Sequence, residues 1–110
     1  MRGEEIASRY LVRRGYSIIE RNFRSSYGEI DIVAFDPKEK TLIFVEVKFR
    51  SRKSQVSPLE SVDWRKIEKL RKTALSYIST KKVSYSSIRF DVIGITQGKE
   101  IEVEHIEDAF

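Results

Sequence analysis

A chain of 110 residues, of which 40% are hydrophobic, has room for one folded domain with a packed core. It contains no cysteine, which excludes disulfide bonds and thiolate metal sites. The sequence has no apolar run long enough to span a bilayer and no basic-then-apolar secretion signal at its start. These features predict a cytoplasmic protein that does not associate with a membrane.

The net charge of +4 is distributed unevenly along the chain. Residues 48–82 carry eleven Lys or Arg against three Asp or Glu, whereas residues 83–110 carry two against six. A concentrated basic segment is typical of proteins that bind polyanions such as nucleic acids. A solvated, lysine-rich helix face produces the same pattern, so charge alone leaves both interpretations open.

The first half of the chain alternates between helical and β-rich patterns. Residues 4–14 have helical spacing and are followed by Gly15, which favours the end of a helix. Three β-rich segments follow at residues 16–23, 30–35 and 41–49. The turn-forming sequence Asp-Pro-Lys-Glu-Lys separates the last two segments and predicts a hairpin between them.

The second half begins with a basic segment without periodicity at residues 50–57, which predicts a loop. Pro58 then opens a predicted helix, and two strands follow at residues 88–95 and 100–104. The apolar stripe of that helix comprises Val62, Ile67, Leu70, Ala74 and Ile78. This order predicts one α/β domain over residues 1–110, with a mixed central sheet of about five strands flanked by helices.

The predicted hairpin fixes which side chains face one another. A four-residue loop places Asp31 opposite Glu46 and Glu29 opposite Lys48, all on one face of the sheet. Directly opposed side chains have Cβ atoms about 4.5–5.5 Å apart. A bulge or an odd-length loop would reverse the face of one strand, so the register itself is a prediction.

Two neighbouring carboxylates in an apolar strand need a compensating charge. Glu46 is flanked by Phe44, Val45 and Val47, and burial costs a carboxylate its hydration. A divalent cation such as Mg²⁺ compensates this cost and also binds phosphate. Lys48 would then orient the attacking water or neutralise charge on the phosphate. The alternative is an ion pair on an exposed sheet face, but Asp31 in register and the basic segment that follows favour the metal site.

Glu4 is a further candidate acid. In the first helix it shares a face with Ala7, Ser8 and Leu11, and it therefore borders the buried stripe. It is either an additional carboxylate near the metal or a first-turn Glu that the helix dipole stabilises. Local considerations favour the second interpretation.

The residues of this hairpin carry a family resemblance. Gly-Glu-Ile-Asp-Ile-Val at 28–33, followed by Phe-Val-Glu-Val-Lys-Phe-Arg at 44–50, resembles the PD-(D/E)XK nuclease superfamily. More closely, nearly the whole chain resembles the YraN family of small bacterial proteins, which are similar to archaeal Holliday-junction resolvases. The matching residues include Gly3-Glu4, Tyr10-Leu11, Gly15-Tyr16, Arg21-Asn22, Arg89-Phe90-Asp91-Val92 and Ala109-Phe110.

The resemblance implies a restriction-endonuclease-like core with Asp31 and Glu46 as ligands of Mg²⁺ or Mn²⁺. It also implies that Lys48 is the catalytic lysine, that Glu4 is the first-helix acid near the metal, and that Lys66 contacts phosphate. By analogy with resolvases, it suggests a homodimer that acts on DNA, including branched DNA.

Two departures from the family pattern leave the proposed ligands untouched. Ile30 stands where the superfamily has a proline before the aspartate. Val56 stands where the family often has glycine, which would change how the following loop moves.

Basic side chains around the motif are expected to bind DNA phosphates, so that binding weakens as the salt concentration rises. Phosphate contacts do not distinguish bases, so little sequence specificity is expected. The candidates are Arg50, Arg52, Lys53, Arg65, Lys66 and Lys69.

Three other residues have competing interpretations. Trp64 would stack on an unpaired base or seal the contact between helix and sheet, and the second is favoured. His105, the sole histidine, is expected at the surface. Asp91 is expected to cap or to pair near Arg89 rather than to act in the site.

The sequence therefore supports a metal-dependent DNA endonuclease as the leading hypothesis. A nucleic-acid-binding module that does not cut, within a repair or recombination assembly, is the alternative. A basic face that contacts an acidic protein is a third interpretation, which salt-sensitive DNA binding would contradict.

Overall fold

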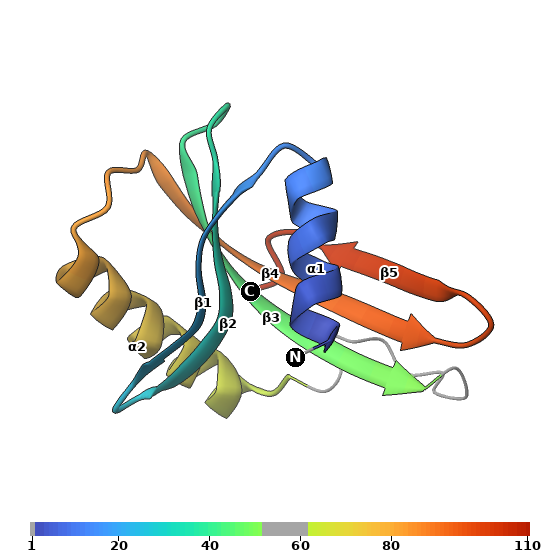
Figure 1. Cartoon of the computed structure of the whole chain (residues 1–110). Coiled ribbons are helices and arrows are strands. Elements are labelled where there is room, and N and C mark those ends of the chain that lie inside the picture. Colours follow the sequence, from blue (N-terminus) through green and yellow to red (C-terminus); the bar gives the residue numbers. More distant parts are fainter. Residues whose placement is uncertain (1, 52–61) are drawn as a thin grey trace.

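The computed structural model describes residues 2–51 and 62–110. Five strands form one sheet in the order β1-β2-β3-β4-β5, in which β3 and β4 are parallel and the other neighbours are antiparallel. The predicted α/β fold with a restriction-endonuclease-like core is confirmed (Figure 1). The elements in chain order are α1 (Arg2–Arg13), β1 (Ser17–Ser25), β2 (Gly28–Asp36), β3 (Thr41–Ser51), α2 (Trp64–Lys81), β4 (Ser87–Gln97) and β5 (Ile101–Ile106).

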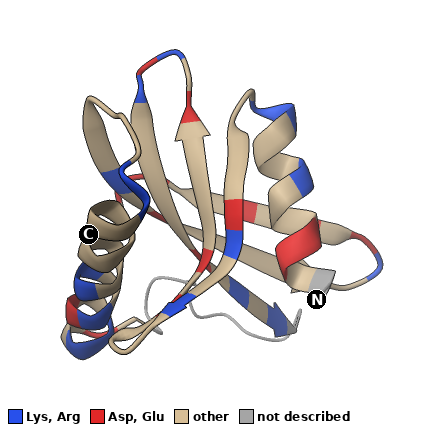
Figure 2. Cartoon of the chain, turned by 60° about the vertical axis from the view of Figure 1, so that its left-hand side comes forward, with Lys and Arg blue, Asp and Glu red and all other residues tan. Residues whose placement is uncertain are grey.

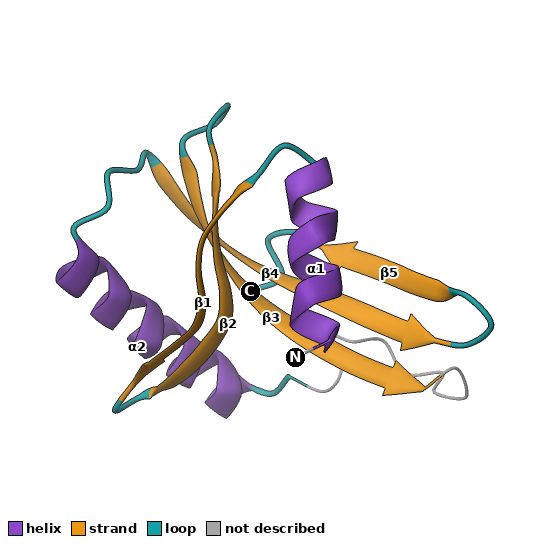
Figure 3. Cartoon of the chain, in the orientation of Figure 1, coloured by secondary structure: helices purple, strands orange, loops and turns teal. Residues whose placement is uncertain are grey.

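The two helices cover different faces of the sheet (Figure 3). Alternate side chains of a strand point to opposite faces, and β3 shows this directly. Ile43 and Val45 pack in one core with α1, whereas Leu42 and Phe44 pack in a second core with α2. The central strands are therefore apolar on both faces, which explains their continuous hydrophobic runs. Within the described ranges, no helix is long and apolar enough to cross a membrane.

Helix α2 connects the parallel strands β3 and β4. It begins at Trp64 rather than at Pro58, so the predicted start was wrong. Asp63 has extended backbone angles, and its carboxylate accepts a hydrogen bond of 3.0 Å from the N–H of Lys66. This N-cap satisfies a free N–H of the first turn and fixes where the helix begins. Pro58 itself lies outside the described residues.

The register of the β2–β3 hairpin was predicted correctly in the part nearest its turn. Pairs from Asp36↔Thr41 to Ile32↔Val45 follow the expected pattern. Beyond Ile32, β2 leaves β3 and stays paired only with β1, as Figure 1 shows. Glu29 consequently forms its ion pair with Arg24 of β1, at 3.0 Å, rather than facing Lys48 as a cross-strand neighbour.

Candidate active site

A pocket of about 370 Å³ opens where β2 and β3 part. Strands β2 and β3 contribute the acidic side chains and one lysine, and α2 contributes two further lysines. Its lining residues are Gly28, Glu29, Asp31, Glu46, Val47, Lys48, Lys66, Lys69 and Leu70. The structure therefore brings Asp31, Glu46, Lys48 and Lys66 together, as the sequence predicted.

Asp31 lies at the point where the strands separate. Its Oδ2 accepts a hydrogen bond of 2.7 Å from the backbone N–H of Val47 in β3. The carboxylate thus supplies the acceptor that the backbone of a paired strand would otherwise supply. Burial raises the pKa of Asp31 to about 7, although the Val47 N–H acts in the opposite direction. The negative charges of Glu46 and Glu4 raise the pKa further.

Glu46 is buried, with 6% of its surface exposed, and it is surrounded by cationic groups. Its Oε2 lies 2.5 Å from Lys66 Nζ and 3.3 Å from Lys48 Nζ. Burial alone would lower the pKa of Lys66, but the hydrogen bond and charge of Glu46 outweigh this effect and raise it. The charged form of Lys66 is therefore stabilised beside a buried carboxylate.

Glu4 occupies the first turn of α1 and is also buried, with 8% of its surface exposed. Its Oε1 has no hydrogen-bond partner among the described residues. Its charge contributes to the raised pKa of Asp31. A carboxylate oxygen without a partner is costly to bury, so this position favours a cation or a water molecule.

The donor set fits a hard divalent cation. Asp31 and Glu46 supply carboxylate oxygens within one pocket, and Glu4 is a third acid whose charge acts on Asp31. In the side-chain arrangement of residues 2–51 and 62–110, however, no three acidic or histidine groups are close enough to form a complete metal site. Lys66 contacts the Glu46 oxygen that a cation would use.

Basic residues are concentrated in the N-terminal half of α2 (Figure 2). Lys66 and Lys69 line the pocket, and the Arg65 guanidinium lies 5.4 Å from the centre of the Trp64 ring. The side chain of Arg50 instead reaches toward β4 and β5. It donates hydrogen bonds to Thr96 of β4 at 3.2 Å and to Glu104 of β5 at 3.3 Å. The predicted DNA-binding residues Arg52 and Lys53 lie outside the described residues.

Trp64 was expected to seal the helix against the sheet, and this prediction was wrong. The side chain is 69% exposed, because Trp64 is the first residue of α2 and the helix begins later than predicted. The helix is sealed instead by Tyr77, whose ring packs edge-on against Phe23 and Phe44.

His105 was expected at the surface but its side chain is only 3% exposed. Its Nε2 lies 2.7 Å from Asp91 Oδ2, and Arg89 donates two hydrogen bonds of 2.9 Å to the same carboxylate. The expectation that Asp91 pairs with its neighbourhood is thus confirmed. The alternating pattern of β5 could have predicted this burial. Val103 and His105 point to one face of the strand, whereas the exposed Glu102 and Glu104 point to the other.

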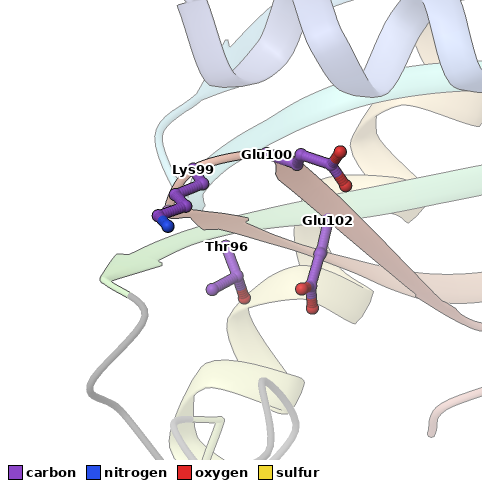
Figure 4. Close-up of a pocket in the computed structure, with 5 residues that line it drawn as sticks. Thr96, Lys99, Glu100 and Glu102 are labelled. Atoms are coloured by element: carbon purple, nitrogen blue, oxygen red, sulfur yellow. The ribbon is translucent and has the colours of Figure 1, made fainter.

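A second, smaller hollow of about 230 Å³ lies at the β4–β5 turn (Figure 4). It is lined by Thr96, Gly98, Lys99, Glu100 and Glu102, all from one hairpin. The carboxylates of Glu100 and Glu102 point in different directions, and both residues are exposed. The pocket in which a buried carboxylate (Glu46) and a half-buried one (Asp31) lie together is therefore the candidate active site.

Comparison with known proteins places the chain in a family. The model of "Uncharacterised protein family UPF0102" matches residues 3–95. The chain belongs to UPF0102. The predicted resemblance to YraN proteins is thereby confirmed. UPF0102 proteins of Alkaliphilus metalliredigens and Pelobacter propionicus are 42% and 46% identical to it, over 98% and 99% of this chain and 93% and 79% of theirs. A UPF0102 protein of Thermodesulfovibrio yellowstonii is 46% identical over 98% of this chain and 91% of its own.

One similar solved structure is Pyrococcus furiosus SfsA in complex with Ca²⁺. The match covers 94% of the present UPF0102 chain and 60% of the SfsA chain, less than two thirds of its length. With 16% identity and a TM-score of 0.31, the similarity supports no argument about fold or activity.

Proposed function

We propose that this UPF0102 protein is a metal-dependent endonuclease that hydrolyses DNA phosphodiester bonds, including those of branched or distorted DNA. The observation that carries the proposal is the convergence of Asp31 and Glu46 with Lys48 and Lys66 in one pocket. Two carboxylates from neighbouring strands, one of them beside two lysines, match what hydrolysis of a phosphodiester requires.

Asp31 and Glu46 would hold Mg²⁺ or Mn²⁺, with Glu4 as an additional acid. The bound cation would activate water and offset the charge of the phosphate. Lys48, which lies beside Glu46, is the catalytic lysine and stabilises the negative charge that grows on the phosphate oxygens. Lys66 exchanges its contact with Glu46 for a contact with the substrate phosphate.

The first turns of α2 supply affinity for the DNA backbone. Arg65, Lys66 and Lys69 lie near the N-terminus of the helix, where the helix dipole also favours phosphate. This attraction does not depend on base sequence, so binding should weaken steeply as salt rises. A two-fold symmetric homodimer would place two such sites on a branched substrate, one for each strand.

The decisive experiment is a cleavage assay on single-stranded, duplex and four-way-junction DNA, in Mn²⁺ or in EDTA. Wild type should cut at least one substrate in Mn²⁺ alone, and Asp31→Ala and Glu46→Ala should abolish cutting. Glu102→Ala removes an exposed carboxylate of the β4–β5 hairpin and is the matched control, which should retain activity. Equal cutting by wild type and the two site variants would contradict the proposal.

The alternative is a module that binds nucleic acid without cutting it. The contacts of Glu46 with Lys48 and Lys66 favour this alternative, because they neutralise the carboxylate without a metal ion. Under it, wild type cuts none of the three substrates, and both site variants bind DNA as wild type does.

A further inference from the structure

A third hollow lies between the β1–β2 turn and α2. It is shallow, has a volume of about 760 Å³, and is lined by Tyr27, Lys72, Leu75, Ser76, Ile78 and Ser79. Tyr27 is 53% exposed and Leu75 is 64% exposed, although both are large apolar side chains. Exposed aromatic and aliphatic groups that share one hollow indicate a binding surface.

The β1–β2 turn joins this hollow to the active-site pocket. Tyr27 precedes Gly28, and Gly28 lines the pocket that contains Asp31. Gly28 also packs closely on α2, where an added Cβ would lie 3.3 Å from Thr73 Oγ1. The turn is therefore held against the helix. Asp31 is four positions after Tyr27 in the sequence, and four positions of extended chain span about 13 Å.

The charge around the turn favours a polyanion. Lys69 lines the active-site pocket and Lys72 lines the Tyr27 hollow, so each of the two hollows has a cationic group from α2. No carboxylate within residues 2–51 and 62–110 forms a salt bridge with either lysine. An aromatic ring with cationic neighbours is the combination that binds single-stranded nucleic acid, because bases stack on the ring and phosphates meet the cations.

We propose that Tyr27 is a stacking platform for an unpaired DNA base, and that Lys72 contacts the phosphate beside that base. The proposal rests on the proposed function, since it concerns the strand whose phosphate enters the Asp31–Glu46 pocket. The base that stacks on Tyr27 belongs to a nucleotide a short distance along the same strand. A continuous duplex keeps its bases stacked inside the helix and cannot use this platform.

Binding in EDTA tests the proposal without cleavage. The probes are a fluorescein-labelled oligothymidylate and a labelled duplex of equal length, titrated with the full-length protein and followed by anisotropy. Tyr27→Ala should weaken binding of the oligothymidylate by about 5- to 100-fold and leave duplex binding within about twofold. Tyr27→Phe keeps the ring and should bind both probes as wild type does.

Two controls separate stacking from other effects. Tyr85→Ala removes another exposed tyrosine, between α2 and β4, and should change neither affinity. Lys72→Ala should weaken both probes to a similar extent, because phosphate contacts do not depend on pairing. A 2-aminopurine base in the single strand should lose fluorescence on binding wild type and Tyr27→Phe but not Tyr27→Ala.

The outcomes also separate this inference from the proposed function. Equal affinities of wild type and Tyr27→Ala for oligothymidylate, or an equal loss on both probes, would overturn the stacking platform even if the protein cuts DNA. Loss of oligothymidylate binding in Tyr27→Ala would support it even if wild type cuts nothing. Failure of wild type to bind either probe would overturn both the stacking platform and the proposed nuclease function. The remaining candidate to occupy the hollow would then be a protein partner.

Discussion

The carboxylate of Asp31 accepts a hydrogen bond from the backbone N–H of Val47 immediately beyond the last paired residues of β2 and β3. The same separation of strands opens the pocket and directs Asp31 toward the strand that carries Glu46. Asp31 therefore both marks the point where the two strands part and supplies a carboxylate to the candidate active site. Since burial raises the pKa of Asp31 to about 7, the ionisation of this group must affect stability near neutral pH.

The first prediction concerns the pH dependence of stability without metal. The pKa of Asp31 is about 7 in the folded protein and near its ordinary value of 3.8 when unfolded. Between these values the folded state binds the extra proton, so stability falls as pH rises through this window. Asp31→Asn should therefore be more stable than wild type at pH 8, by about 2 kcal/mol, and nearly equal to it at pH 3. Urea unfolding in EDTA across this range measures the difference.

The control for this prediction is Glu29→Gln, whose carboxylate lines the same pocket but pairs with Arg24 at the edge of the sheet. Between pH 3 and pH 8, the unfolding free energy of Glu29→Gln should change with pH in the same way as that of wild type. Parallel curves for Asp31→Asn and wild type would show that Asp31 does not titrate near neutrality.

Most elements, and the grouping of the candidate site residues in one pocket, could be predicted because they depend on local patterns. The β-rich run at residues 41–49 and the turn at 36–40 predict the part of the hairpin nearest its turn, with its register. The separation of β2 from β3 beyond Ile32 was not predictable, since a β-rich run does not specify where two paired strands part. The burial of His105 was missed because it depends on Asp91, a partner on another strand.

The second prediction concerns the contact between Lys66 and Glu46. A divalent cation and the Lys66 ammonium compete for the same carboxylate oxygen. Lys66→Ala should therefore bind Mn²⁺ several-fold more tightly than wild type, while its affinity for DNA falls. Isothermal titration with Mn²⁺ alone measures the first effect. Lys69→Ala removes a lysine of the same pocket that has no such contact in the described structure, and should leave Mn²⁺ affinity unchanged. Weaker Mn²⁺ binding by Lys66→Ala would contradict the competition.

The third prediction compares two aromatic residues of the α2 side of the molecule. Trp64 is 69% exposed, so Trp64→Ala should change the free energy of unfolding by less than about 0.5 kcal/mol. Phe44 is 2% exposed and packs against Tyr77 and Phe90, so Phe44→Ala should cost about 3–5 kcal/mol. Urea unfolding of both variants tests the difference. A cost of several kcal/mol for Trp64→Ala would restore its predicted role in sealing the helix.

The fourth prediction concerns the buried carboxylate of Asp91, which is fully inaccessible to solvent. Burial raises the pKa of Asp91, but hydrogen bonds with His105 and Arg89 outweigh this effect and lower it. Arg89→Ala would leave the carboxylate without its bidentate partner and should cost about 3–5 kcal/mol at pH 7.

The loss caused by Arg89→Ala should itself depend on pH, with a sign opposite to that of Asp31. Because the folded pKa of Asp91 is lowered, its network stabilises the fold above the ordinary pKa of aspartate and loses this effect as pH falls through the folded pKa. The difference between Arg89→Ala and wild type should therefore shrink on acidification. Arg9→Ala is the matched control, since Arg9 pairs with Glu5 at 2.7 Å on the exposed face of α1, and it should cost less than about 0.5 kcal/mol. Similar costs for the two arginine variants would mean that the buried carboxylate is satisfied by His105 and the backbone N–H of Asp108 without Arg89.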